Sequence, residues 1–131
     1  PSNTLTLTTL ANYWVNGGSV GYLLWVHRSL NWDEARKFCQ DMGGDLPVLN
    51  NATKRIDMMN FASGKSSSYW VCGNDRSGAW LWLNGYGQVT DGWRYDQPNE
   101  DEGDDTCLYM SSSETLLDYP CTNSNNFYCQ K

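Results

Sequence analysis

Carboxylates are concentrated in one short stretch of the sequence, from Asp96 to Asp105. Six of its ten residues are acidic, and no lysine or arginine interrupts them. Calcium is a hard cation that takes about six to eight oxygen ligands, so a loop rich in carboxylates suits it. A run of like charges can equally be a loop exposed to solvent. Composition alone favours neither interpretation.

Other kinds of chemistry find less support in the sequence. Nucleophilic catalysis needs a base beside a serine or cysteine. The only histidine, His27, lies in the apolar run from Gly21 to Arg28, where we expect it to be buried. The five cysteines form no CxxC pair, which argues against a zinc site. Carboxylate pairs of the kind that glycosidases use are an alternative, but a metal-binding acidic loop explains the same residues more simply. We therefore predict a protein that is not an enzyme.

The overall composition sets the class of protein. The chain has 131 residues, the size of one domain, and a net charge of −6, which makes nucleic acid an unfavourable partner. Five cysteines in a chain of this size indicate a disulfide framework in an oxidising compartment, so we expect a secreted or extracellular protein. No run approaches the ~18 to 20 apolar residues of a membrane span. No signal peptide is recognisable, as expected of a mature form or an excised domain.

Two helices are predicted in the first half of the chain and short strands elsewhere. Asn31 and Glu34 form a capping-box pattern before an amphipathic stretch that ends at Gly43-Gly44. A second helix is predicted from about Ala52 to Phe61, with Asn51 as its cap. A turn-rich interval covers residues 84–105, long enough to suggest a functional loop. Strands are predicted at residues 21–28, 69–73, 80–83, 106–110, 115–118 and 127–130.

Four segments, taken in order, resemble the C-type lectin-like domain in its short form. They are NWDEARKFCQDMGGDL (31–46), YWVCGND (69–75), WRYDQPN (93–99) and NFYCQK (126–131). The resemblance implies an α+β fold, in which two helices flank small antiparallel sheets and a long calcium-binding loop. It covers residues 21–131, and residues 1–20 are expected to be an N-terminal arm or a first strand.

The same resemblance implies how the cysteines pair. The family's pattern joins Cys39 to Cys129 and Cys107 to Cys121, whereas arithmetic on five cysteines does not choose among the pairings. Cys72 is then left without a disulfide partner. It stands in an apolar strand, where a buried and inert thiol is favoured. An intermolecular disulfide is the alternative.

The family's main calcium site takes side chains on either side of a proline, expected to be in cis, and from residues near the loop cysteines. Carried over by position, the implied ligands are Gln97, Asn99, Asp105 and Asp118. Leu117 departs from the pattern, because the family has an asparagine there and leucine offers no oxygen. Fewer anionic ligands imply weaker calcium binding.

The sugar that such a site would take is not determined by the sequence. In the family that the sequence resembles, Glu-Pro-Asn goes with mannose-like sugars and Gln-Pro-Asp with galactose-like ones, whereas residues 97–99 here read Gln-Pro-Asn. Glu100 and Tyr119 are the further residues expected beside the ligand. Single sites of this kind bind weakly, so assembly into homo-oligomers would supply avidity.

We therefore expect a calcium-dependent carbohydrate-binding lectin domain. The alternative is a calcium-independent member of the same fold that binds a protein or another non-sugar ligand, as Leu117 and the mixed Gln-Pro-Asn sequence suggest.

Overall fold

The computed structural model describes residues 14–94, 97–98, 106–112 and 115–131 of the chain. Within these ranges, no helix is long and apolar enough to cross a membrane. The elements run in the order β1 (Val15–Asn16), the 3-10 turn η1 (Gly18–Val20), β2 (Tyr22–Leu30), α2 (Trp32–Asp41), α3 (Ala52–Ala62), β3 (Tyr69–Asn74), β4 (Leu81–Trp82), β5 (Thr106–Met110), β6 (Leu116–Pro120) and β7 (Asn125–Gln130).

Both predicted helices are confirmed, together with their caps. At the start of α2 the Asn31 side chain accepts a hydrogen bond from the Glu34 amide at 2.9 Å, and the Glu34 carboxylate accepts one from the Asn31 amide at 3.3 Å. This reciprocal pair satisfies two amides that the first turn of a helix leaves without partners. Asn51 caps α3 through the amide of Lys54 at 2.9 Å. After α2, Gly43 adopts a φ of 91°, a left-handed conformation that glycine accepts without penalty.

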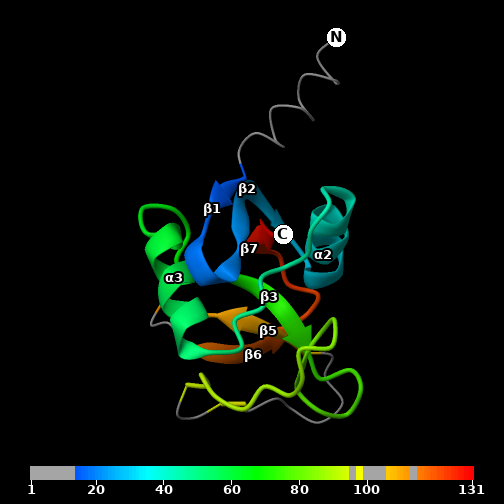
Figure 1. Ribbon diagram of the computed structural model, residues 1–131. Coiled ribbons are helices and arrows are strands. Elements are labelled where there is room, and N and C mark those ends of the chain that lie inside the picture. Colours follow the sequence, from blue (N-terminus) through cyan, green and yellow to red (C-terminus); the bar gives the residue numbers. More distant parts are fainter. Residues whose placement is uncertain (1–13, 95–96, 99–105, 113–114) are drawn as a thin grey trace.

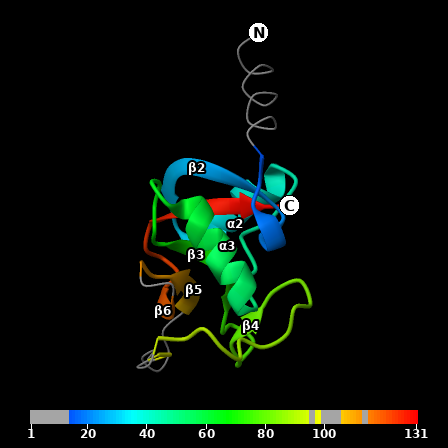
Figure 2. The same cartoon turned by 60° about the vertical axis from the view of Figure 1, so that its left-hand side comes forward.

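The strands of the described residues form one seven-stranded sheet, in the order β1-β2-β7-β3-β5-β6, with β4 paired to β3. The predicted α+β class is confirmed, although the strands join in one mixed sheet rather than in separate antiparallel ones. They do so because β7 pairs antiparallel with β2 and parallel with β3. Figures 1 and 2 show α2 and α3 on opposite sides of β2 and β7, with β5 and β6 at the far end from β1.

The two central strands differ from β2 in how they are buried. Every residue of β3 is buried, and in β7 the buried residues are Phe127, Tyr128 and Cys129. In β2, Leu24 and Val26 are buried but His27 is exposed, so the expectation of a buried histidine is wrong. His27 follows a core residue in a pleated strand, and the pleat turns successive side chains to opposite faces.

Two disulfides tie these elements together. Cys39–Cys129 joins α2 to β7, and Cys107–Cys121 joins β5 to the residue that follows β6, as the family's pattern implies. The first closes a separation of 90 residues and the second one of 14. In the chain-entropy model, loops of these sizes stabilise the fold by roughly 4–5 and roughly 3 kcal/mol, respectively.

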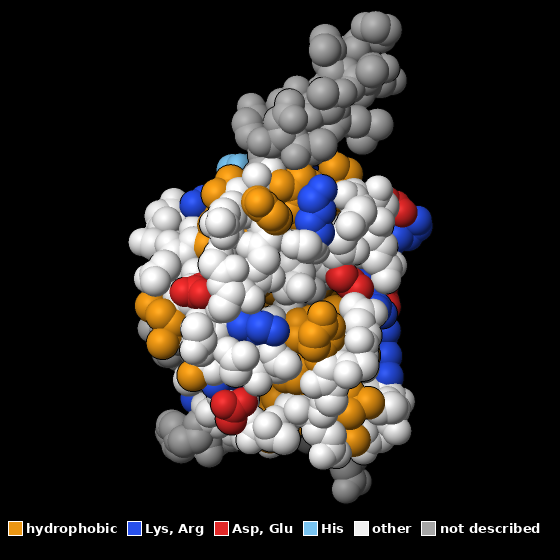
Figure 3. All heavy atoms as spheres, in the orientation of Figure 1, with side chains coloured by type: hydrophobic (Ala, Val, Ile, Leu, Met, Phe, Trp, Pro, Cys, Tyr) orange, Lys and Arg blue, Asp and Glu red, His pale blue; other side chains and the backbone are white. Residues whose placement is uncertain are grey.

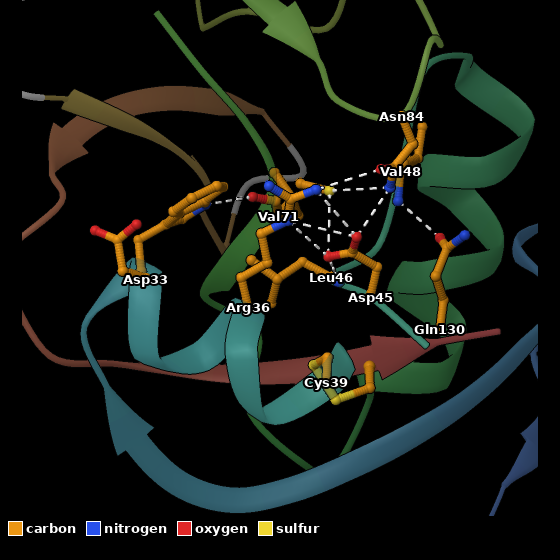
Figure 4. Close-up of polar contacts among 12 residues, drawn as sticks. Asp33, Arg36, Cys39, Asp45, Leu46, Val48, Val71, Asn84 and Gln130 are labelled. Atoms are coloured by element: carbon orange, nitrogen blue, oxygen red, sulfur yellow. Dashed lines mark hydrogen bonds and ion pairs between the residues drawn. A yellow bond between two sulfur atoms is a disulfide. The ribbon is translucent and has the colours of Figure 1, made fainter. Parts of the chain in front are cut away.

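A polar network connects Arg36 on α2 with Asp45, in the segment after α2, and with Asn84, which follows β4 (Figure 4). The Arg36 guanidinium donates to the Asp45 carboxylate at 3.1 Å, and the Asn84 amide donates to the same carboxylate at 2.9 Å. Burial alone would raise the pKa of Asp45, but the hydrogen bonds from Arg36, Asn84 and the Leu46 amide outweigh burial, and the pKa is lowered. The network therefore stabilises the charged form of Asp45.

Cys72 points into this network from β3. Its side chain is fully buried and bears a free thiol, which donates to an Asp45 oxygen at 3.6 Å. Burial raises the pKa of the Cys72 thiol far above its ordinary value, and the negative charge of Asp45 raises it further. Because the thiolate is the reactive species, the structure agrees with a buried, inert cysteine rather than an intermolecular disulfide.

Replacing Asp45→Asn tests the network through the pH dependence of stability. The pKa of Asp45 is lowered in the folded state. Its contribution to the free energy of unfolding is therefore complete above the pKa of the unfolded chain, about 4, and is lost as the pH falls through the pKa of the folded state. At neutral pH the variant should lose roughly 1–3 kcal/mol of unfolding free energy. Its stability should also decline less steeply than that of the wild type in acid, as measured by denaturant unfolding from neutral pH downwards. Asp41→Asn, at an exposed ion pair on α2, is the matched control. If the unfolding free energies of Asp45→Asn and the wild type fell in parallel as the pH is lowered, the lowered pKa of Asp45 would be contradicted.

Alkylation tests the burial of Cys72. In the native protein at neutral pH, iodoacetamide should leave the chain unmodified, because the thiol is both inaccessible and protonated. After unfolding without reductant, mass spectrometry should detect one added group, since the other four cysteines form the two disulfides. Rapid native labelling, or a disulfide-linked dimer on a non-reducing gel, would show that Cys72 is accessible.

Candidate functional site

The loop that leads to Gln97 is attached to the outer edge of β6. Gly92 accepts a hydrogen bond from the Leu116 amide at 2.8 Å, and the Arg94 amide donates to the Leu116 carbonyl at 3.0 Å. Between them, Trp93 and Leu116 form a parallel bridge. Trp93 also packs edge-on against Trp80 at 5.1 Å, with partial burial against the core. The backbone of residues 92–94 is thus held as an additional strand segment beside β6.

A buried arginine holds the start of the same loop. Arg55, on α3, is 8% exposed, and its guanidinium donates to the Leu49 carbonyl at 3.0 Å and to the Asp91 carboxylate at 2.9 Å. The Gly92 backbone lies so close to this guanidinium that a Cβ there would come within 2.9 Å of it. The sequence analysis missed this anchor. Arg55 is one of several polar residues in a weakly amphipathic helix, and its acidic partner lies 36 residues away.

The Gln97–Pro98 peptide bond is cis, which confirms the expectation for this motif. The Gln97 backbone amide donates to the Arg94 carbonyl at 2.8 Å, at the end of the segment paired with β6. The Gln97 side chain then reaches back to the strand, where its oxygen accepts a hydrogen bond from the Asp118 amide at 3.3 Å. The structure therefore brings together two of the four ligands expected from the sequence.

Strand β6 carries Leu117, Asp118 and Tyr119 and is fixed by its pairing with β5. Asp118 lies opposite Leu108, and Tyr119 lies opposite Cys107. The Cys107–Cys121 disulfide closes this hairpin just beyond Pro120. Asp118 is therefore positioned by a paired and covalently linked strand, one edge of which receives the Gln97 loop.

Tyr119 is 37% exposed and belongs to an aromatic cluster. It stacks on Tyr109 with ring centroids 5.1 Å apart at 22°, and Trp70 meets it edge-on at 6.1 Å. Such contacts hold the ring in one orientation. The cluster gives Tyr119 a packing role in the sheet and leaves part of its side chain exposed.

The remaining expected residues are Asn99, Glu100 and Asp105, which lie outside the described residues. Within the described ranges, no group of three or more His, Cys, Asp or Glu residues is arranged to hold a metal ion. The Gln97 amide and the Asp118 carboxylate offer oxygen atoms as metal ligands, the atoms that calcium prefers. The described part of the site is thus chemically compatible with a hard cation.

Known proteins share both the sequence and the fold of this chain. The family model of the lectin C-type domain matches residues 28–131. The human C-type lectin domain family 17, member A is 31% identical over 103 residues, which cover 77% of this chain and 27% of that protein. The chain thus spans about a quarter of the length of this relative.

Two solved structures resemble the fold. The mouse scavenger receptor C-type lectin carbohydrate-recognition domain superposes with a TM-score of 0.78 at 24% identity, covering 91% of this chain and 93% of that one. A calcium-independent type II antifreeze protein superposes with a TM-score of 0.76 at 21% identity, covering 89% of each chain. Domains of this kind are binding modules without enzymatic activity. On the match of its sequence and the arrangement of its sheet, loop and disulfides, this chain belongs to the C-type lectin domain family.

Proposed function

We propose that this domain binds carbohydrate through a calcium ion held at the Gln97–Pro98 loop and β6. The observation that carries the proposal is the contact between the Gln97 side chain and the backbone of Asp118 at 3.3 Å, beside the Cys107–Cys121 disulfide. The calcium ligands are Gln97, Asn99, Asp105 and Asp118, of which Asn99 and Asp105 lie outside the described residues.

The protein's part in recognition follows from the donors and acceptors of these side chains. When bound, calcium offers coordination positions to two neighbouring sugar hydroxyls. The carboxylate of Asp118 accepts a hydrogen bond from a hydroxyl, and the amide NH₂ groups of Gln97 and Asn99 donate to hydroxyl oxygens. Glu100 and Tyr119 border the ligand, with the Tyr119 ring oriented by its stack on Tyr109. A shallow site of this kind gains useful affinity when several domains assemble.

The location of the domain is part of the same proposal. Two disulfides in one small domain support an oxidising, extracellular environment. The binding domain occupies residues 21–131, with residues 15–20 as a first strand and turn. These residues pack against the domain through β1–β2 pairing and through Ser19, whose hydroxyl donates to Asp57 at 2.6 Å.

A second candidate is a calcium-independent domain that binds a protein or another non-sugar ligand through the same loop. Leu117 favours it, because a leucine replaces a side chain that would supply an oxygen. The antifreeze protein of similar fold is calcium-independent, so folds of this kind are not confined to calcium-dependent proteins.

Calcium titration of an Asp118→Asn variant tests the first candidate. The substitution preserves size and the backbone amide that meets Gln97, but it removes an anionic ligand. We expect calcium affinity, measured by isothermal titration calorimetry, to fall at least about tenfold, which corresponds to ~1.4 kcal/mol. Asp41→Asn, on the surface of α2, is the matched control and should bind calcium as the wild type does.

The same preparations distinguish the two candidates. A glycan array probed with calcium and again with a strong chelator should show sugar binding only with calcium. No heat of calcium binding at millimolar concentration, with or without monosaccharide, would rule out the calcium-dependent proposal. Partner binding that persists in the chelator would instead favour the second candidate.

Leu117→Asn should strengthen calcium binding, because it adds an amide oxygen directly before Asp118 on a strand already fixed by β5. We expect an affinity increase of about tenfold. Leu117→Ala is the matched control, since it removes the same leucine without supplying an oxygen. Equal calcium affinities for the asparagine and alanine variants, both folded by circular dichroism, would show that residue 117 does not face the ion.

A further inference from the structure

The outer edge of β2 is largely uncovered by the described strands. β1 pairs only with Tyr22 and Leu23, whereas β2 continues to Leu30. On its other edge, β2 pairs with β7, and Tyr22 and Lys131 exchange both backbone hydrogen bonds there. Hydrogen-bonding direction alternates along an antiparallel strand, so the N–H and C=O groups of Trp25 point to the outer edge. After Val26 the register between β2 and β7 shifts, and pairing resumes at Ser29.

Two apolar depressions lie along this edge, one towards each helix. The depression beside α3 has a volume of about 720 Å³, and the one beside α2 has a volume of about 310 Å³. Figure 3 shows apolar side chains gathered at this end of the molecule, over β1 and β2. The α3 side includes Val15, Trp25, Asn60, Phe61 and Lys65. The α2 side includes Val26, Arg28 and Phe38.

The walls of these depressions are held by the core. Trp25 packs on Tyr128 at 4.8 Å, and Phe61 meets the same tyrosine edge-on at 5.7 Å. The Tyr128 hydroxyl is itself fixed by donating to the Ser66 carbonyl. On the other side, Phe38 packs edge-on against Phe127 at 5.7 Å. The side chains beside the open edge are therefore pre-positioned by contacts with β7.

The two sides of the edge also carry positive charge, although the whole chain has a net charge of −6. The Arg28 guanidinium lies over the Phe38 ring at 5.6 Å, and the Lys65 ammonium lies over the Phe61 ring at 4.5 Å. Both side chains are exposed, and neither forms an ion pair with a described residue. Each cation thus stands at an aromatic wall, where it can meet a carboxylate of a ligand.

We propose that the outer edge of β2 around Trp25 binds an extended, acidic peptide segment of a partner protein by strand addition. The partner's backbone would bond to the outward N–H and C=O groups of Trp25. Its alternate side chains would enter the α3-side and α2-side depressions, and its carboxylates would meet Lys65 and Arg28. Strand addition takes its affinity from main-chain hydrogen bonds and its specificity from pockets for alternate side chains. This edge lies across the sheet from β6, so the proposal does not depend on calcium or sugar binding.

The test uses the full chain and a fluorescent synthetic peptide of alternating valine and threonine with a glutamate at each end. We expect binding in fluorescence anisotropy, and loss of at least about tenfold in affinity when the peptide's bonding amides are N-methylated. In the protein, Trp25→Pro removes the outward N–H of residue 25 without removing a bond to β7. It should weaken binding about tenfold relative to Trp25→Ala, which loses the same indole ring but keeps that N–H.

Charge reversal tests the acidic character of the partner. Arg28→Glu and Lys65→Glu should each weaken binding of the glutamate-ended peptide and strengthen binding of a lysine-ended one. The N-methylated peptide requires no protein variant, so the proposal remains testable if Trp25→Pro does not fold.

Several results would overturn the proposal. They are absence of peptide binding to the full chain, equal affinity for the N-methylated peptide, and indifference to charge reversal. Dimerisation in sedimentation equilibrium that Trp25→Pro abolishes, without any peptide binding, would assign the edge to a second copy of this chain instead.

Discussion

Strand β7 connects the parts of this domain, because it lies between the N-terminal and C-terminal strands of the sheet. It pairs antiparallel with β2 on one side and parallel with β3 on the other. Its Cys129 is bonded to α2 through Cys39, and the neighbouring Tyr128 packs against Trp25, Phe61 and Tyr69. Without β7, the strand that bears Asp118 and the strand that bears His27 would belong to separate sheets.

The candidate calcium site depends on this scaffold through β6. Residues 91–94 and Gln97 lie outside the named strands, and three attachments position them: Arg55 to Asp91, the backbone bonds to Leu116, and Gln97 to Asp118. Arg55 is buried, and the charge of such a group requires compensation in the interior. Asp91 and the Leu49 carbonyl supply it, so the burial of one cation fixes the start of the loop.

The two proposed binding regions use opposite parts of one sheet in different ways. At β6 the outer edge is occupied by the chain's own loop, so backbone groups serve to position side-chain oxygens. At β2 no described strand pairs with the edge beyond Leu23, and the proposed ligand bonds to the backbone there. An exposed strand edge is a template for pairing with another chain, which is the basis of the binding proposed at this edge.

The elements with local signals were predictable from sequence. The capping box of Asn31 and Glu34 marked the start of α2, and Gly43 marked its end. In the apolar run of β2, by contrast, the sequence did not show that Trp25 is less buried than Leu24 and Val26. The placement of Gln97 beside a cis proline followed from resemblance to a family rather than from composition or periodicity. Tertiary structure alone decided that the strands form one sheet, that His27 is exposed and that Arg55 anchors the loop. The physical reason is range: caps and turns arise from residues a few positions apart, whereas sheet order, strand edges and the Arg55–Asp91 pair join segments that only the folded core brings together.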